Sequence, residues 1–115
     1  MRSFLPSRLD LKCQERTVQL QFKGNAFELY LFHRGNAVSH AVHLTAAQLR
    51  QVSIDLRPVE AVPLKLLYEG RHVVIELKGH VWIRIPDIQF LRLVELAIDG
   101  KGASMEIDPK RLGQP

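Results

Sequence analysis

The sequence is poor in the residue types that scaffold, membrane and secreted proteins depend on. It has one cysteine, Cys13, so an internal disulfide cannot form, and a reducing cytoplasm is the expected setting. No apolar run approaches the roughly 20 residues of a membrane-spanning helix. The first residues also lack the continuous apolar core of a secretory signal. We therefore expect one cytoplasmic domain over residues 1–115.

Catalytic and metal-binding signatures are missing as well. The glycines fall in expected turns between strands, and none belongs to a strand–loop–helix phosphate cradle. His40 and His43 lie three apart in an expected strand and so point to opposite faces. Cys13 has no second cysteine with which to bind zinc. We therefore expect a non-enzymatic protein with no metal and no cofactor.

The charge balance is mildly basic. Sixteen Lys and Arg against twelve Asp and Glu give a net charge of +4. Such a balance permits an anionic partner but does not require one.

Alternating apolar residues predict an antiparallel meander in the first half of the chain. Strands are expected over 17–23, 26–33 and 37–44, joined by turns at 24–25 and 34–36. Thr45 and Gln48 have the spacing of a capping box, which predicts a helix from there to about Leu56. Residues 8–13 also alternate and are a candidate edge strand. Residues 57–62 are interpreted as a linker.

The second half repeats this order. Strands are expected over 64–68, 72–78 and 80–85, followed by a helix from Pro86 to Asp99 that Gly100 closes. Residues 103–107 are a candidate last strand.

The two halves align well enough to predict an internal repeat. At an offset of 46, Phe27 matches Val73 and Leu29 matches Ile75; beyond the second turn, Thr45 falls on Pro86. We therefore predict an α+β fold of two tandem β-β-β-α repeats, over 17–56 and 63–100, with 101–115 as a short strand and basic tail. Its antiparallel sheets are each covered by their own helix, and the two helices share one core.

Aromatic and basic residues gather on the predicted outer sheet faces, where Tyr30, Phe32 and Trp82 replace the expected polar residues. Flat rings that stack on bases, together with cations that contact phosphates, suit a single-stranded nucleic acid. The candidate nucleic-acid-binding residues are Lys23, Tyr30, Phe32, Lys65, Lys78, His80, Trp82 and Arg84. The alternative is that these rings are buried in an interface, because large apolar surface patches commonly mark protein contacts.

Repeated meanders that each end in a helix resemble the Whirly and Pur-type single-stranded nucleic acid binding proteins. The resemblance covers residues 17–100, and its local echoes are residues 41–49 and 81–86, where a strand runs into a helix. It implies binding of DNA or RNA on the sheet faces. These families have four strands in each unit, whereas only three are clear here.

The leading hypothesis is thus a non-enzymatic, homodimeric protein that binds single-stranded DNA or RNA across its outer sheet faces. The alternative hypothesis is a protein–protein interaction or self-assembly module that uses the same aromatic faces.

Overall fold

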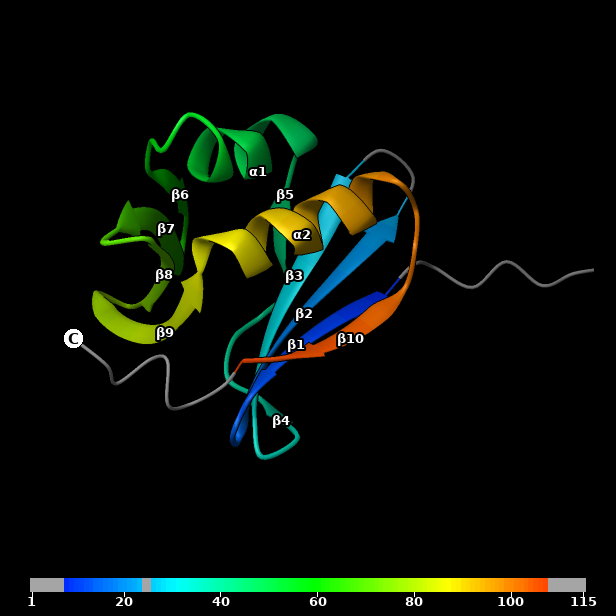
Figure 1. The fold of residues 1–115 in the computed structure, drawn as a ribbon. Coiled ribbons are helices and arrows are strands. Elements are labelled where there is room, and N and C mark those ends of the chain that lie inside the picture. Colours follow the sequence, from blue (N-terminus) through cyan, green and yellow to red (C-terminus); the bar gives the residue numbers. More distant parts are fainter. Residues whose placement is uncertain (1–7, 24–25, 108–115) are drawn as a thin grey trace, which may run out of the picture.

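A computed structural model describes residues 8–23 and 26–107, apart from the side chains of Lys23 and Ala103. The chain forms a larger sheet, a smaller sheet and two helices packed together (Figure 1). The larger sheet contains β1 (Arg8–Cys13), β2 (Arg16–Lys23), β3 (Ala26–His33), β4 (Asn36–Ala37), β5 (Val42–Leu44) and β10 (Ala103–Glu106). The smaller sheet contains β6 (Val59–Ala61), β7 (Leu64–Glu69), β8 (His72–Leu77) and β9 (His80–Pro86). The helices are α1 (Ala46–Ser53) and α2 (Asp87–Ile98).

The α+β class with largely antiparallel sheets is confirmed. The larger sheet has the order β10-β1-β2-β3-β4, with β5 also paired to β3, and the smaller sheet has the order β6-β7-β8-β9. Every pairing is antiparallel except that of β10 with β1, which is parallel. The last strand therefore returns to the sheet of the first half.

Each half has more strands than the three predicted. The candidate edge strand at 8–13 is β1, and the expected linker at 57–62 contains β6. The expected strand at 37–44 is interrupted, because β4 ends at Ala37 and β5 begins at Val42. The first helix ends at Ser53, before the predicted Leu56. The expected turn at Gly24–Asn25 lies outside the described residues.

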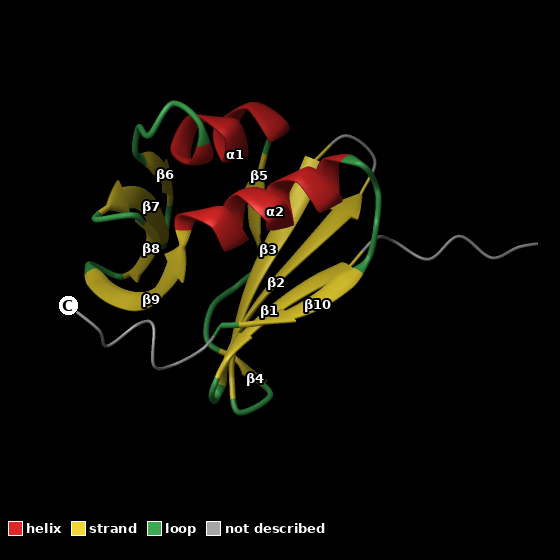
Figure 2. Ribbon diagram, viewed as in Figure 1, coloured by secondary structure: helices red, strands yellow, loops and turns green. Residues whose placement is uncertain are grey.

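The sequence predicts that each helix covers the sheet of its own half, but the structure differs. Among strands, α1 packs mainly against β6 and β7 of the second half. The longer α2 contacts β8 and β9 and also reaches β1 and β2 of the first half (Figure 2). The prediction of separately covered sheets is therefore wrong, while the prediction of helices packed together in one core is confirmed.

A single apolar cluster joins these layers. It includes Leu20 and Leu29 of the larger sheet, Ile75 of the smaller sheet, Leu49 of α1 and Phe90 of α2. No described polar or charged residue is buried. Burial of apolar side chains from both halves is thus the main source of stability.

The predicted start of α1 is confirmed in detail. The Thr45 Oγ1 accepts from the Gln48 backbone N–H at 3.1 Å, and the Gln48 Oε1 accepts from the Thr45 backbone N–H at 2.9 Å. This reciprocal pair satisfies two amides that the first turn of a helix leaves without partners.

We expect Thr45→Ala to lower the free energy of unfolding by about 1 kcal/mol, because the cap is lost. Urea denaturation measures the change. Ser53→Ala is the matched control, since its hydroxyl donates to the Leu49 carbonyl within the same helix and contributes little. Equal effects of the two substitutions would contradict the capping role.

The end of α2 follows the predicted glycine closure. Gly100 has φ of 73°, its N–H donates to the Ala97 carbonyl at 3.1 Å, and the Lys101 N–H donates to the Leu96 carbonyl at 2.9 Å. These two bonds are those of a Schellman motif. Within the described residues, no helix is long and apolar enough to cross a membrane.

Candidate functional site

The only tryptophan of the chain, Trp82, lies at an irregularity in the smaller sheet. Ile75 pairs with Ile83 and Glu76 pairs with Val81, so Trp82 is the extra residue between two paired positions of β9. A bulge of this kind re-aims side chains. Beyond the bulge the predicted alternation holds, with Ile83 and Ile85 buried and Arg84 exposed. At the bulge it fails, because Val81, which alternation places inside, is 47% exposed, whereas Trp82 is half-buried and packs against the core.

Trp82 contacts Arg16 at the start of β2, 66 residues earlier. The Arg16 Cζ lies over the indole, 5.3 Å from its centroid, which is a cation–π contact. The Arg16 Nη1 also donates to the Trp82 carbonyl oxygen. The two contacts join the β1–β2 end of the larger sheet to β9 of the smaller sheet.

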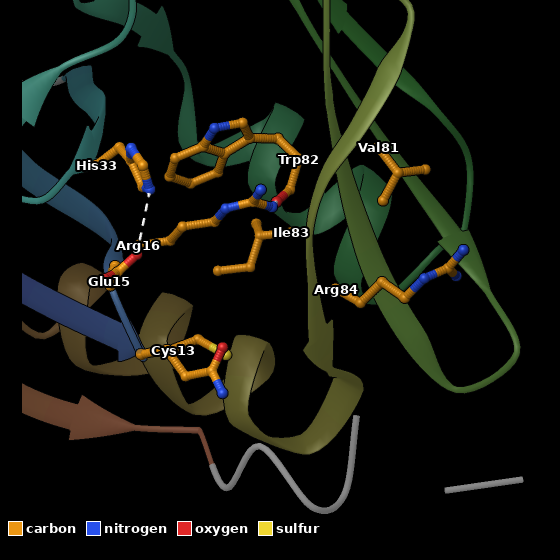
Figure 3. Close-up of a pocket in the computed structure, with 9 residues that line it drawn as sticks. Cys13, Glu15, Arg16, His33, Val81, Trp82, Ile83 and Arg84 are labelled. Carbon is orange, nitrogen blue, oxygen red and sulfur yellow. Dashed lines mark hydrogen bonds and ion pairs between the residues drawn. The ribbon is translucent and has the colours of Figure 1, made fainter. Parts of the chain in front are cut away.

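An open groove of about 770 Å³ lies at this junction (Figure 3). Its lining comprises Cys13, Gln14, Glu15, Arg16, His33, Val81, Trp82, Ile83 and Arg84. The Glu15 carboxylate is 3.6 Å from His33 Nε2 and 3.0 Å from the Arg34 guanidinium. Arginine, histidine and a fixed carboxylate therefore surround an aromatic ring in a space large enough for a small ligand.

Cys13 lies in this groove as a buried thiol. Its side chain is 8% exposed, and burial raises the pKa of the thiol, an effect that the Arg16 charge partly opposes. The thiolate is the nucleophilic form of cysteine, so a raised pKa disfavours covalent chemistry here. Among the described residues, no three His, Cys, Asp or Glu side chains gather closely enough to hold a metal ion.

We expect iodoacetamide to alkylate Cys13 much more slowly in the folded protein at neutral pH than in the chain unfolded in urea. Both low exposure and the raised pKa act in this direction. Mass spectrometry gives an unambiguous rate, because the chain has one cysteine. Similar rates in the two states would contradict the burial of the thiol.

Tyr30 and Phe32 lie together on the outer face of the larger sheet, away from Trp82. Their rings stack with centroids 6.1 Å apart and planes 15° from parallel. The Tyr30 hydroxyl donates to Glu28, and the same carboxylate lies 3.0 Å from His43 Nε2. Among the described side chains, this surface thus places the Glu28 carboxylate beside its aromatic rings.

Two candidate cations of the smaller sheet, Arg84 and Lys65, have acidic neighbours. Arg84 points away from Trp82 in Figure 3, and its Nη1 donates to Glu69 at 3.1 Å. Lys65 stands opposite Glu60 on one side and Glu76 on the other. These acidic neighbours reduce the positive charge that Arg84 and Lys65 present on this sheet.

The remaining candidates are dispersed. Lys78 is exposed in the β8–β9 turn with φ of 53°, and His80 is exposed at the start of β9. The side chain of Lys23 lies outside the described part of the structure. The seven candidates whose side chains the structure describes thus do not form one surface.

Arg16, Glu15 and His33 line the groove but are not among the predicted site residues. Local periodicity explains their strands but says nothing about a partner 66 residues away. The bulge that turns Trp82 toward them has no marker in the sequence, because no glycine stands beside it.

Comparison with known proteins gives no further guide: no family model, no curated protein and no solved structure matches this chain.

Proposed function

We propose that the protein binds single-stranded nucleic acid in the groove between its two sheets, with Trp82 as the ring on which a base stacks. The observation that carries the proposal is the half-buried indole of Trp82. It lies at a bulge in β9 and lines an open groove beside Arg16. An aromatic ring fixed by its surroundings loses little conformational freedom on binding. Base stacking on such a ring contributes about 1–3 kcal/mol.

The charges near the groove favour a phosphate-bearing ligand. The two guanidinium groups of Arg16 and the neighbouring Arg34 outnumber the single carboxylate of Glu15. The outer faces, in contrast, match Arg84 and Lys65 with acidic residues. Because unbalanced cations attract a polyanion, the groove is a better binding surface than either face.

The strand count supports the resemblance to Whirly and Pur-type proteins. Those families have four strands before each helix. Four strands, β6 to β9, precede α2, and four precede α1 if β4 and β5, which both pair with β3, are taken as one interrupted strand. We further propose that the halves are tandem copies of one unit. Thr45 and Pro86, which the repeat aligns, are the N-cap residues of α1 and α2.

Fluorescence titration of Trp82 with single-stranded oligonucleotides tests the proposed function. We expect saturable quenching of the Trp82 fluorescence at low salt. The affinity should fall steeply at moderate salt, because the release of counterions from the phosphates then contributes less free energy to binding. A duplex of the same length is the control, because its paired bases cannot stack on the indole. An unchanged spectrum at every oligonucleotide concentration would overturn the proposal.

A second candidate function rests on the outer face of the larger sheet. There the stacked Tyr30 and Phe32 lie beside Glu28, a combination better suited to a protein partner, or to a second copy in a homodimer, than to a polyanion. Light scattering of the wild-type protein and of Tyr30→Ser/Phe32→Ser distinguishes self-association from a monomer. A dimer that the double substitution dissociates would support this role.

A further inference from the structure

We infer that Arg16 blocks the binding ring of the free protein and exchanges its contact with Trp82 for a phosphate when a single strand binds. This inference rests on the proposed function and concerns how the same groove is regulated. In this mechanism Arg16 lowers the access of a base to the indole in the free protein and contributes a phosphate contact in the complex.

The first part of the argument is that Arg16 and a base compete for the same ring. The guanidinium lies over the indole at 5.3 Å from the centroid, and both side chains line the groove. The other surroundings of Trp82 include the apolar core, against which it packs. A base that stacks on the groove side of the indole must therefore displace the guanidinium or share the ring with it.

The second part is that Arg16 has a better partner once a strand is present. It lies on the exposed surface, and its contacts with Trp82 are a cation–π contact and a bond to a neutral carbonyl. A phosphate next to the stacked base offers charge-assisted, bidentate hydrogen bonds, which are stronger than those to a neutral acceptor. Among the described residues, Arg16 forms no ion pair with a carboxylate, and Glu15, which lines the groove, pairs with His33 and Arg34.

The exchange has a signature in the salt dependence of binding. Each phosphate contact to a single strand adds about 0.7 to the slope of log affinity against log salt. Arg16→Ala removes one such contact but also uncovers the indole. We therefore expect the variant to bind more weakly than wild type at low salt and more tightly at high salt, so that the two curves cross.

Arg34→Ala is the matched control. It removes a cation from the same end of the groove but leaves the indole covered, so its curve should lie below that of the wild type and approach it at high salt without crossing. Anisotropy of a labelled oligonucleotide measures all three proteins over the same salt series. Arg16→Gln, which keeps a donor for the Trp82 carbonyl, replaces Arg16→Ala if that variant does not fold.

Acrylamide quenching of Trp82 in the free proteins provides the independent readout. Without any nucleic acid, quenching should rise in Arg16→Ala and stay at the wild-type value in Arg34→Ala. If wild type binds no oligonucleotide, the proposed function fails. If wild type binds but Arg16→Ala loses affinity by one constant factor at all salt concentrations, or leaves acrylamide quenching unchanged, the function stands and the exchange is overturned.

Discussion

Replacing Phe90 by alanine is expected to lower the free energy of unfolding by about 3–5 kcal/mol, the usual cost of removing a buried phenyl ring. Phe90 is fully buried, and its helix α2 contacts strands of both sheets. The cavity would thus open where the two halves meet. A domain of this size has a total stability of about 5–15 kcal/mol, so the loss is a large part of it.

Ile88→Ala on the same helix is the control. Ile88 is 79% exposed, and its truncation should change the free energy of unfolding by less than about 0.5 kcal/mol. Urea denaturation with an unchanged m-value measures both. If Phe90→Ala does not fold, Phe90→Leu gives a smaller loss that can still be quantified. A Phe90 variant as stable as the Ile88 variant would show that α2 does not join the two sheets.

Local features of the fold could be predicted because each depends on neighbours in sequence. Alternation places Leu20 and Leu29 inside, and the spacing of Thr45 and Gln48 marks the start of α1. Gly100 closes α2 for the same local reason, since its positive φ is accessible at little cost only to glycine.

Features that depend on distant contacts could not be predicted. The packing of α1 on β6 and β7 and the parallel pairing of β10 with β1 are decided by which surfaces meet in space. The short β6 was interpreted as a linker because three residues are too few for alternation to identify a strand.

The candidate site shows the same division. Trp82 could be selected from sequence because a large ring on an expected polar face is unusual. Its surroundings could not, because the bulge re-aims the ring from the face that bears Arg84 toward Arg16. The one extra residue of the bulge therefore decides whether Trp82 belongs to a site on the outer sheet face or to a site in the groove between the sheets.

Because Trp82 lies in the groove, its substitution is expected to have the largest effect on the affinity for a single strand. We expect Trp82→Leu to weaken single-strand binding by at least about tenfold, which corresponds to the loss of roughly 1.4 kcal/mol of stacking on one base. Leucine keeps an apolar side chain against the core but has no ring. Trp82→Phe, which keeps a smaller ring, should lose less. Anisotropy of a labelled oligonucleotide is the measurement, since these variants lack the intrinsic fluorophore.

The outer faces provide the matched comparison. Tyr30→Ser/Phe32→Ser removes two rings from the larger sheet, and Lys65→Ala removes a cation that stands opposite Glu60 and Glu76 on the smaller sheet. If the single strand binds in the groove, both variants should bind it with an affinity within about twofold of wild type, because neither substitution touches the indole or Arg16. A large loss in the double variant with normal binding by Trp82→Leu would instead place the strand on the outer face. If the base stacks on Trp82, loss of the Trp82 ring should weaken binding, whereas loss of the stacked Tyr30 and Phe32 rings should not.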